Sequence, residues 1–142
     1  MTIAPPRKLE KHVDPRGWVA EVLRPELLPA ALRKSFGQIY LSSANEGQVK
    51  ANHYHTRKHE WFWPVRGTVL IALQQLDSKG APTGPVETFT LAADDPAVLF
   101  VPALVAHAIK AVGGPATVAA YITEPYNPKD TDTFPFPLLK PG

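Results

Sequence analysis

Between Gly47 and Gly67 the chain reads GQVKANHYHTRKHEWFWPVRG, and three of its five histidines stand there beside a glutamate. The segments VKAN before the histidines and WFWP after them favour strand over helix. The residues between His55 and His59 include no glutamate, so the HExxH helix motif of metalloproteases is absent. We therefore interpret this stretch as two β-strands joined by a turn.

This interpretation places three polar groups together. Side chains two positions apart on a β-strand share a face, so His53 and His55 point the same way. Thr56–His59 supplies a turn, and Glu60 opens the next strand. A hairpin of this kind brings Glu60 across from the two histidines.

His107 adds a fourth polar group. It stands in the apolar run FVPALVAHAI, on a later expected strand that follows a proline-led turn. Three neutral imidazoles and one carboxylate suit Zn, Fe, Mn, Ni or Co and leave positions open for water or a substrate. The residues His53, His55, Glu60 and His107 thus form a set that suits a divalent transition metal.

The rest of the chain alternates short apolar runs with turn signals. Runs such as FGQIYLSS, TVLIALQQLD, VETFTL and TVAAYITEPY are rich in β-branched and aromatic residues, and segments such as DSKGAPTG separate them. PELLPAALRKS has room for one or two helical turns, because Pro29 stops anything longer. About nine to ten short strands, without long amphipathic helices, predict an antiparallel sandwich or closed barrel.

Length and proline content indicate one domain. The 142 residues match the ~100–200 residues of a typical domain. Sixteen prolines interrupt the chain, which works against long helices. The segments APPR and FPFPLLKPG near the two ends are proline-rich. We expect a single domain over residues 1–142 with extended, proline-rich terminal arms.

Charge and cysteine content exclude several classes of protein. The net charge is +2 and the lysines and arginines are scattered, so no basic run is present to bind nucleic acid. The chain has no cysteine, which removes disulfides, thiolate nucleophiles and sulfur ligands. Its first residues do not resemble a secretion signal, and no run approaches ~18 apolar residues. We expect a cytoplasmic protein with no membrane partner.

The spacing around the histidines resembles the first motif of the cupin superfamily, in which two glycines bracket two histidines and a glutamate. Here the motif is carried by Gly47, His53, His55, Glu60 and Gly67. Pro102 and His107 resemble the second motif, although Leu104 replaces its glycine and Ala111 its asparagine. The resemblance implies an all-β fold, the double-stranded β-helix or jelly-roll barrel of cupins. It also implies that His53, His55, Glu60 and His107 are the ligands of one divalent transition metal, for which we expect Zn²⁺ foremost.

Three segments resemble the dTDP-4-dehydrorhamnose 3,5-epimerase branch of the cupins. They are DPRGWVAEVLR near the start, FGQIYLSSANEGQVKANHYH before the histidines, and YITEPYNPKDTDTF near the end. The last segment looks still more like the C-terminal cupin domain of capsular polysaccharide assembling proteins. In those proteins an Asn-Glu…Asp-Pro…Asp-Thr pattern follows a metal-binding cupin.

The epimerase resemblance implies a reaction and candidate catalytic residues. These enzymes remove a proton beside a ketone and return one from the other face of the enolate. His53 falls at the position of their base, Lys50 at that of an arginine near the developing charge, and Tyr126 at a second pocket tyrosine. Their acid tyrosine corresponds to Ala120, and a histidine that binds metal cannot also act as base. We therefore expect a metal to polarise the ketone, which lowers the demand on the base.

The same resemblance points to sugar contacts and to a partner. Gln38, Tyr40 and Tyr121 are the expected substrate-binding residues. We expect a homodimer that epimerises or isomerises a 4-keto-deoxy sugar, nucleotide-linked, in surface polysaccharide synthesis. Two alternatives stay open: an Fe(II)-dependent cupin oxygenase acting on a small ketone, enol or aromatic acid, and a non-catalytic sugar-binding cupin. Bound iron favours the oxygenase, because Zn²⁺ cannot activate O₂ by redox chemistry.

Overall fold

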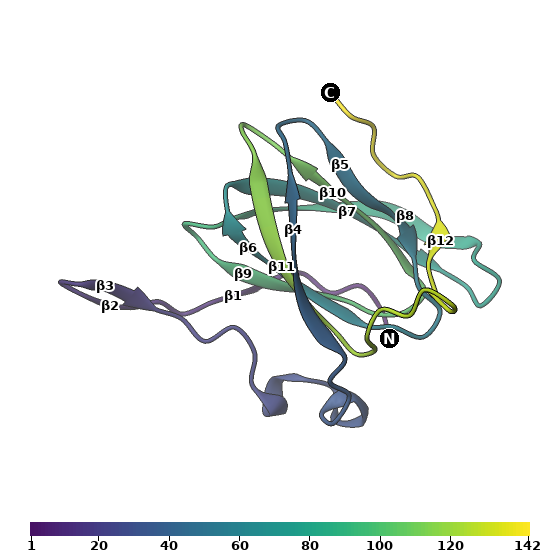
Figure 1. The fold of residues 1–142 in the computed structure, drawn as a ribbon, viewed down its shortest axis with the longest axis horizontal. Helices are drawn as coiled ribbons and strands as arrows, with labels where there is room; N and C mark the ends of the chain where they lie inside the picture. Colours follow the sequence, from purple (N-terminus) through teal and green to yellow (C-terminus); the bar gives the residue numbers. More distant parts are fainter.

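The computed structural model describes residues 1–142 as two facing β-sheets with a small hairpin at one side (Figure 1). Helical structure is limited to two 3-10 turns, η1 (Pro25–Leu27) and η2 (Ala30–Leu32), which are the short turns expected in PELLPAALRKS. No helix has the length and apolar character needed to cross a bilayer. The strands are β1 (Arg7–Lys8), β2 (His12–Asp14), β3 (Gly17–Val19), β4 (Gln38–Ala44), β5 (Val49–Tyr54), β6 (Glu60–Arg66), β7 (Thr68–Leu76), β8 (Pro82–Ala92), β9 (Ala97–Val101), β10 (Val105–Ala111), β11 (Ala116–Ile122) and β12 (Phe134–Pro135).

The two main sheets have the topology of a jelly roll. The first sheet has the strand order β1-β9-β6-β11-β4, and the second has the order β12-β5-β10-β7-β8. Each pair of neighbouring strands is antiparallel. From β4 to β6 and from β8 to β11 the chain changes sheet at every connection. The all-β jelly-roll fold expected from the sequence is confirmed.

Apolar side chains fill the space between the sheets. Strand alternation turns Val69, Ile71 and Leu73 of β7 inward, where they join a cluster of 15 buried hydrophobic residues. Phe62 of the facing sheet belongs to the same cluster, and its ring centroid lies 5.7 Å from that of His107. The core thus supports one of the expected metal ligands directly.

A second apolar cluster covers the outer face of the first sheet. Trp61 of β6 and Tyr121 of β11 belong to it, together with Leu28 from the η1–η2 segment. Trp61 stacks on Phe100 with 4.6 Å between ring centroids. The Tyr121 hydroxyl donates a hydrogen bond to the carbonyl oxygen of Ser35 at 2.7 Å. The middle strands of this sheet are therefore buried on both faces.

The hairpin β2–β3 extends away from the two sheets (Figure 1). Its turn is fixed by Asp14, whose carboxylate accepts hydrogen bonds from the backbone amide of Arg16 at 2.8 Å and from its guanidinium at 2.7 Å. Val13, Trp18 and Val19 are exposed on the hairpin. It presents an apolar surface that the rest of the chain leaves uncovered.

Two positions near the histidine strands have left-handed backbone conformations. Gly67 has φ +71°, and a Cβ atom there would lie 2.4 Å from the carbonyl oxygen of Pro115. Leu104 has φ +63°, although it replaces the glycine of the second cupin motif. Its amide donates to the carbonyl oxygen of His55 at 2.7 Å, and its own carbonyl accepts from the amide of Leu76 at 2.9 Å. These bonds hold a leucine in a conformation that favours glycine.

Candidate metal centre

Three histidines meet on the inner side of the second sheet. His53 of β5 and His107 of β10 are direct partners in the strand ladder, and His55 follows just after β5. The ring centroid of His53 lies 4.9 Å from that of His55 and 4.7 Å from that of His107. One ring nitrogen of each histidine lies within 4.8 Å of the others. Imidazole nitrogens gathered in this way suit a single bound cation.

A bulge in β5 precedes the histidines. Ala51 and Asn52 both have positive φ, 69° and 56°, and the register with β10 shifts at this point. An extra residue in one strand bends it and re-aims the side chains that follow. The bulge thus sets the direction from which His53 and His55 approach His107.

Glu60 reaches the histidines from the facing sheet. The expected hairpin was wrong, because the chain changes sheet between β5 and β6 and these two strands do not pair. It opens β6 and is 2% exposed. Its Oε1 atom lies 2.7 Å from Nε2 of His55, and its Oε2 atom accepts a hydrogen bond from the Tyr40 hydroxyl at 3.1 Å. Glu60 therefore joins the cluster through His55, whereas the group whose ligand atoms all lie within 4.8 Å of one another consists of the three histidines.

Burial and neighbouring charge control the protonation of this cluster. Burial lowers the pKa of His53 to about 3, and the nearby imidazoles add to the effect. Burial also lowers the pKa of His107. Burial disfavours protonation of His55 as well, but the hydrogen bond and charge of Glu60 outweigh it and raise the pKa of His55. Burial alone would raise the pKa of Glu60. The hydrogen bond with His55 and the nearby imidazoles outweigh burial, so the pKa of Glu60 is lowered. His53 and His107 are therefore neutral at pH 7.

His107 has the feature that best fits a bound metal. It is 1% exposed, and its Nδ1 atom lies 3.1 Å from the carbonyl oxygen of Val105, so Nδ1 carries the proton. The Nε2 atom is buried without a hydrogen-bond partner. A buried polar atom without a partner costs roughly 1–3 kcal/mol. A cation shared with His53 and His55 would give this nitrogen its partner.

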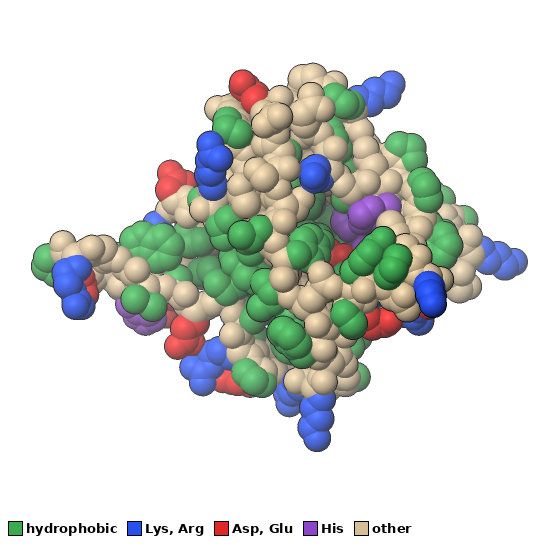
Figure 2. All heavy atoms as spheres, viewed as in Figure 1, with side chains coloured by type: hydrophobic (Ala, Val, Ile, Leu, Met, Phe, Trp, Pro, Cys, Tyr) green, Lys and Arg blue, Asp and Glu red, His purple; other side chains and the backbone are tan.

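A cavity of about 280 Å³ opens beside the cluster. Figure 2 shows imidazole atoms at the surface of a hollow bordered by apolar side chains. The cavity joins candidate metal ligands to polar and aromatic side chains, as small-molecule sites do. It is lined by Gln38, Tyr40, His53, His55, Lys58, Glu60, Ile122, Glu124, Tyr126 and Thr133.

Four of the residues expected to bind substrate or catalyse line this cavity, namely Gln38, Tyr40, His53 and Tyr126. The backbone amide of Tyr126 donates a hydrogen bond to Oε1 of Gln38 at 2.5 Å. This bond ties the segment after β11 to the edge strand β4. The two sides of the cavity mouth are thereby fixed relative to each other.

Two other expected residues lie elsewhere. Lys50 is an exposed residue of β5 and does not line the cavity. Tyr121 packs in the outer apolar cluster, where burial raises the pKa of its hydroxyl. Strand alternation explains the outward position of Tyr121, because the preceding Ala120 points into the core. The catalytic role expected for Lys50 and the substrate-binding role expected for Tyr121 stay predictions, because neither side chain lines the cavity.

Lys58 is a cavity residue that the sequence did not single out. It lies in the turn between His55 and Glu60 and is only 4% exposed. Its Nζ atom donates one hydrogen bond, to the carbonyl oxygen of Thr131 at 3.0 Å, of the three that an ammonium group offers. Turn lysines are usually solvated, and this one is buried by a segment more than seventy residues later. Only the Asp-Thr pattern near the end of the chain pointed to that segment.

Residues 12–134 match the protein family described as the polysaccharide biosynthesis C-terminal domain. The chain is also similar to the spore coat polysaccharide biosynthesis protein SpsL of Bacillus subtilis strain 168. The two sequences are 34% identical over 128 residues, which cover 89% of this chain and 82% of SpsL. Both likenesses extend over most of the chain, the histidine cluster included.

Two solved structures share the fold. The dTDP sugar isomerase of Desulfovibrio desulfuricans G20 has a TM-score of 0.75 and 27% identity, over 93% of this chain and 82% of the isomerase. The capsular polysaccharide assembling protein CapF of Staphylococcus aureus has a TM-score of 0.66 and 23% identity, over 92% of this chain. The chain spans only 34% of the length of CapF, so that likeness concerns the fold alone. These neighbours confirm both resemblances expected from the sequence.

Proposed function

The chain belongs to the polysaccharide biosynthesis C-terminal domain family, and from that membership we propose that it epimerises or isomerises a nucleotide-linked 4-keto-deoxy sugar in surface polysaccharide synthesis. Its relatives support the proposal, because SpsL is a spore coat polysaccharide biosynthesis protein and a dTDP sugar isomerase shares the fold. A cavity lined by polar and aromatic side chains offers room for a sugar.

The histidine–glutamate cluster carries this proposal. His53, His55, His107 and Glu60 would hold one divalent transition metal, with Zn²⁺ foremost. Such a cation supplies Lewis-acid polarisation of the sugar ketone when it is bound. The partnerless Nε2 atom of His107 and the lowered pKa values of His53 and His107 support this assignment, since metal ligands must be deprotonated.

The chain's own side chains would take part in the proton transfers. Epimerisation breaks a C–H bond beside the ketone, leaves the electron pair in the enolate, and forms a new C–H bond on the other face. We assign the return of the proton to Tyr126, which lines the cavity mouth, and the proton removed from the sugar would pass to water that enters the cavity. The Lys58 ammonium, with two N–H donors still free, would bind the oxyanion that develops. His53 is available as the base only in a chain that holds no metal.

We also propose that two copies of the chain associate. The exposed residues Phe36, Ile39, Leu41 and Val65, which we call the outer patch, lie on or beside the first sheet. The projecting hairpin adds a second exposed apolar surface that includes Trp18. Apolar patches of this kind mark interfaces. A cytoplasmic location stays a prediction from the sequence.

The first test of the metal is elemental analysis of protein purified without chelator, beside the His53→Ala/His55→Ala double variant. We expect about one Zn²⁺ per chain in the unchanged protein and none in the variant. A metal content that is the same in both proteins would contradict the assignment of the ligands.

The first test of the reaction is deuterium incorporation from D₂O into dTDP-4-keto-6-deoxyglucose, followed by mass spectrometry. We expect exchange beside the ketone with the metal-loaded protein and none with the double variant. Bound iron without exchange would favour the oxygenase. Binding of the sugar without exchange would favour a non-catalytic sugar-binding protein.

A further inference from the structure

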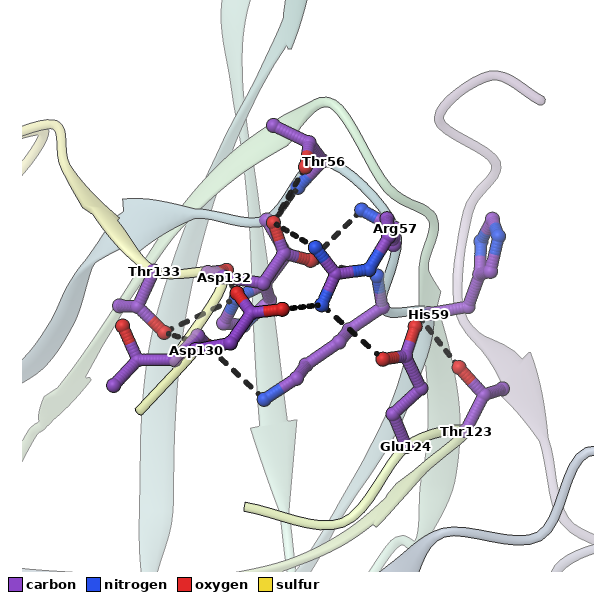
Figure 3. Close-up of polar contacts among 11 residues, drawn as sticks. Thr56, Arg57, His59, Thr123, Glu124, Asp130, Asp132 and Thr133 are labelled. Atoms are coloured by element: carbon purple, nitrogen blue, oxygen red, sulfur yellow. Dashed lines mark hydrogen bonds and ion pairs between the residues drawn. The ribbon is translucent and has the colours of Figure 1, made fainter. Parts of the chain in front are cut away.

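We propose that Asp132 is the positioning residue of the metal centre, holding His55 in the orientation that ligation requires. This inference rests on the proposed function and adds to it a residue outside the four ligands. Asp132 lies in the segment between β11 and β12, far from the histidine strands in sequence. Figure 3 shows its carboxylate directed at the turn that contains Thr56 and Arg57.

The carboxylate of Asp132 binds the whole turn between two of the ligands. It accepts hydrogen bonds from the backbone amides of Thr56 at 2.9 Å, Arg57 at 2.8 Å and Lys58 at 3.1 Å. The hydroxyl of Thr56 donates a fourth bond to the same group. An ionised carboxylate has about four acceptor positions, so this one is fully used by a single turn. The turn therefore has one conformation, and it fixes the path from His55 to Glu60.

The backbone of Asp132 acts on His55 itself. The carbonyl oxygen of Asp132 lies 2.6 Å from Nδ1 of His55, which donates its proton there. Donation from Nδ1 leaves Nε2 as the atom that faces Glu60 and the other histidines. Ligating histidines usually carry such a bond on their second nitrogen, and it sets both tautomer and ring orientation. Here that bond comes from a residue whose side chain also holds the neighbouring turn.

The conformation of Asp132 makes both contacts possible at once. Its φ is +47°, in the left-handed region that side chains other than Asn and Asp seldom adopt. The side chain is 1% exposed, so the contacts form away from competing water. One residue in an uncommon conformation thus joins the C-terminal segment to a metal ligand and to its turn.

Asp130 offers a matched control in the same segment. Its carboxylate pairs with the guanidinium of Arg57 at 3.1 Å, and its side chain is 59% exposed (Figure 3). It contacts neither His55 nor the backbone of the turn. A variant of Asp130 therefore removes a carboxylate from this segment and leaves the positioning bonds in place.

The experiment measures Zn²⁺ affinity by competition with a chromophoric chelator for the unchanged chain and for Asp132→Gly, Asp132→Asn and Asp130→Asn. We expect a 10- to 100-fold loss of affinity, roughly, for Asp132→Gly, as for other residues that orient metal ligands. Glycine can keep the left-handed backbone conformation, but it has no carboxylate to accept the hydrogen bonds from Thr56, Arg57 and Lys58. Asp132→Asn keeps one acceptor oxygen, so we expect a Zn²⁺ affinity between those of the unchanged chain and Asp132→Gly. We expect Asp130→Asn to bind Zn²⁺ as tightly as the unchanged chain.

A second readout does not depend on metal. Nitrogen-15 NMR of the metal-free protein reports the proton on Nδ1 of His55, which the bond to Asp132 protects from exchange. We expect this protected proton in the unchanged chain and in Asp130→Asn. Asp132→Gly keeps the carbonyl that accepts the proton but no longer holds it through the bonds to the turn, so we expect faster exchange there. Fast exchange of that proton in the unchanged chain would overturn the proposal.

The two readouts separate the possible failures. Variants that melt earlier but bind Zn²⁺ unchanged and keep the protected proton would reduce Asp132 to a turn cap and overturn the proposal. An unchanged chain that binds no Zn²⁺ would refute the metal centre by itself. In that case the NMR comparison alone decides whether Asp132 positions His55.

Discussion

The Nε2 atom of His55 lies 2.7 Å from Oε1 of Glu60, five residues later in the chain. The two are expected to share one metal ion, yet without metal they bind each other. The raised pKa of His55 and the lowered pKa of Glu60 describe an imidazolium–carboxylate pair, which a metal has to separate. Loading the site is therefore a proton exchange as well as a coordination step.

Metal binding should release protons. Near pH 6.5, below the raised pKa of His55, we expect on the order of one proton to leave for each Zn²⁺ bound, because the metal replaces the proton on Nε2. Calorimetric titration in two buffers with different ionisation enthalpies measures this number. Glu60→Gln removes the charge that raises the pKa of His55, so His55 should carry fewer protons before metal binds and release fewer on binding. Equal release by both proteins would contradict the pairing.

Replacing His107 should separate stability from metal binding. Without metal, His107→Leu removes a buried nitrogen that has no partner, so we expect the variant to be more stable than the unchanged chain by about 1 kcal/mol. With Zn²⁺ at 100 times its Kd the order should reverse, because only the unchanged chain gains the ~2.7 kcal/mol of binding energy. Urea unfolding with chelator and with Zn²⁺ tests both statements. His12→Leu, on the exposed hairpin, is the control that should respond to neither condition.

Acid should weaken the metal-free fold through Asp132. The hydrogen bonds from Thr56, Arg57 and Lys58 outweigh its burial and lower the pKa of Asp132 to about 2, from 3.8. A lowered carboxyl pKa gives stability that is complete above pH 4 and is lost as the pH falls towards 2. We expect Asp132 to contribute about 2 kcal/mol to this loss. Urea unfolding at pH 5 and pH 2.5 should therefore show a smaller difference for Asp132→Asn than for the unchanged chain.

Two glycines with the same backbone conformation should respond differently to alanine. Gly67 and Gly113 have φ +71° and +72°, but only Gly67 has an atom in the way, the carbonyl oxygen of Pro115 at 2.4 Å. We expect Gly113→Ala to lose about 1 kcal/mol through backbone strain alone, and Gly67→Ala to lose about 3 kcal/mol. Thermal unfolding of the two variants measures the difference. Equal losses would show that the turn at Gly67 can open without cost.

The outer patch should govern self-association. Leu41 is 69% exposed on the edge strand β4, and a lysine there would place a charge within the proposed contact between two copies. We expect light scattering to give the mass of a dimer for the unchanged chain and of a monomer for Leu41→Lys. Val86→Lys, on β8 of the other sheet, should leave the dimer intact. A monomeric unchanged chain would refute the interface outright.

The sequence predicted which residues meet in the cluster better than how they meet. Strand alternation accounts for His53 and His55, but the hairpin expected to bring Glu60 across does not form, because β5 and β6 lie in different sheets. The sequence placed His107 on a later strand, but its pairing with β5 depends on the folding of the whole sheet. The leucine at position 104 shows that a motif can lose its glycine while the backbone keeps the conformation.

The contacts that sequence reasoning missed are those made across long separations. Lys58 and Asp132 owe their burial and bonding to each other's segments, more than seventy residues apart. Neither segment has a periodic sequence pattern that would predict a contact between Lys58 and Asp132. Lys50 shows the converse, because the family resemblance favoured it although it is exposed on β5 and does not line the cavity.

The first sheet is buried on both faces, so the side of the site that carries Glu60 should be more stable than the side formed by the segment around Asp132. Amide hydrogens in β6 and β11 should exchange with solvent only when the whole molecule unfolds, so Glu60 stays in place on any shorter timescale. The segment around Asp132 is held by the bonds of Asp132 to the turn and by the short pairing of β12 with β5, so we expect it to open before the sheets do. The lifetime of a bound ion should then follow the opening rate of this segment, and hydrogen exchange there would report how often the site is accessible.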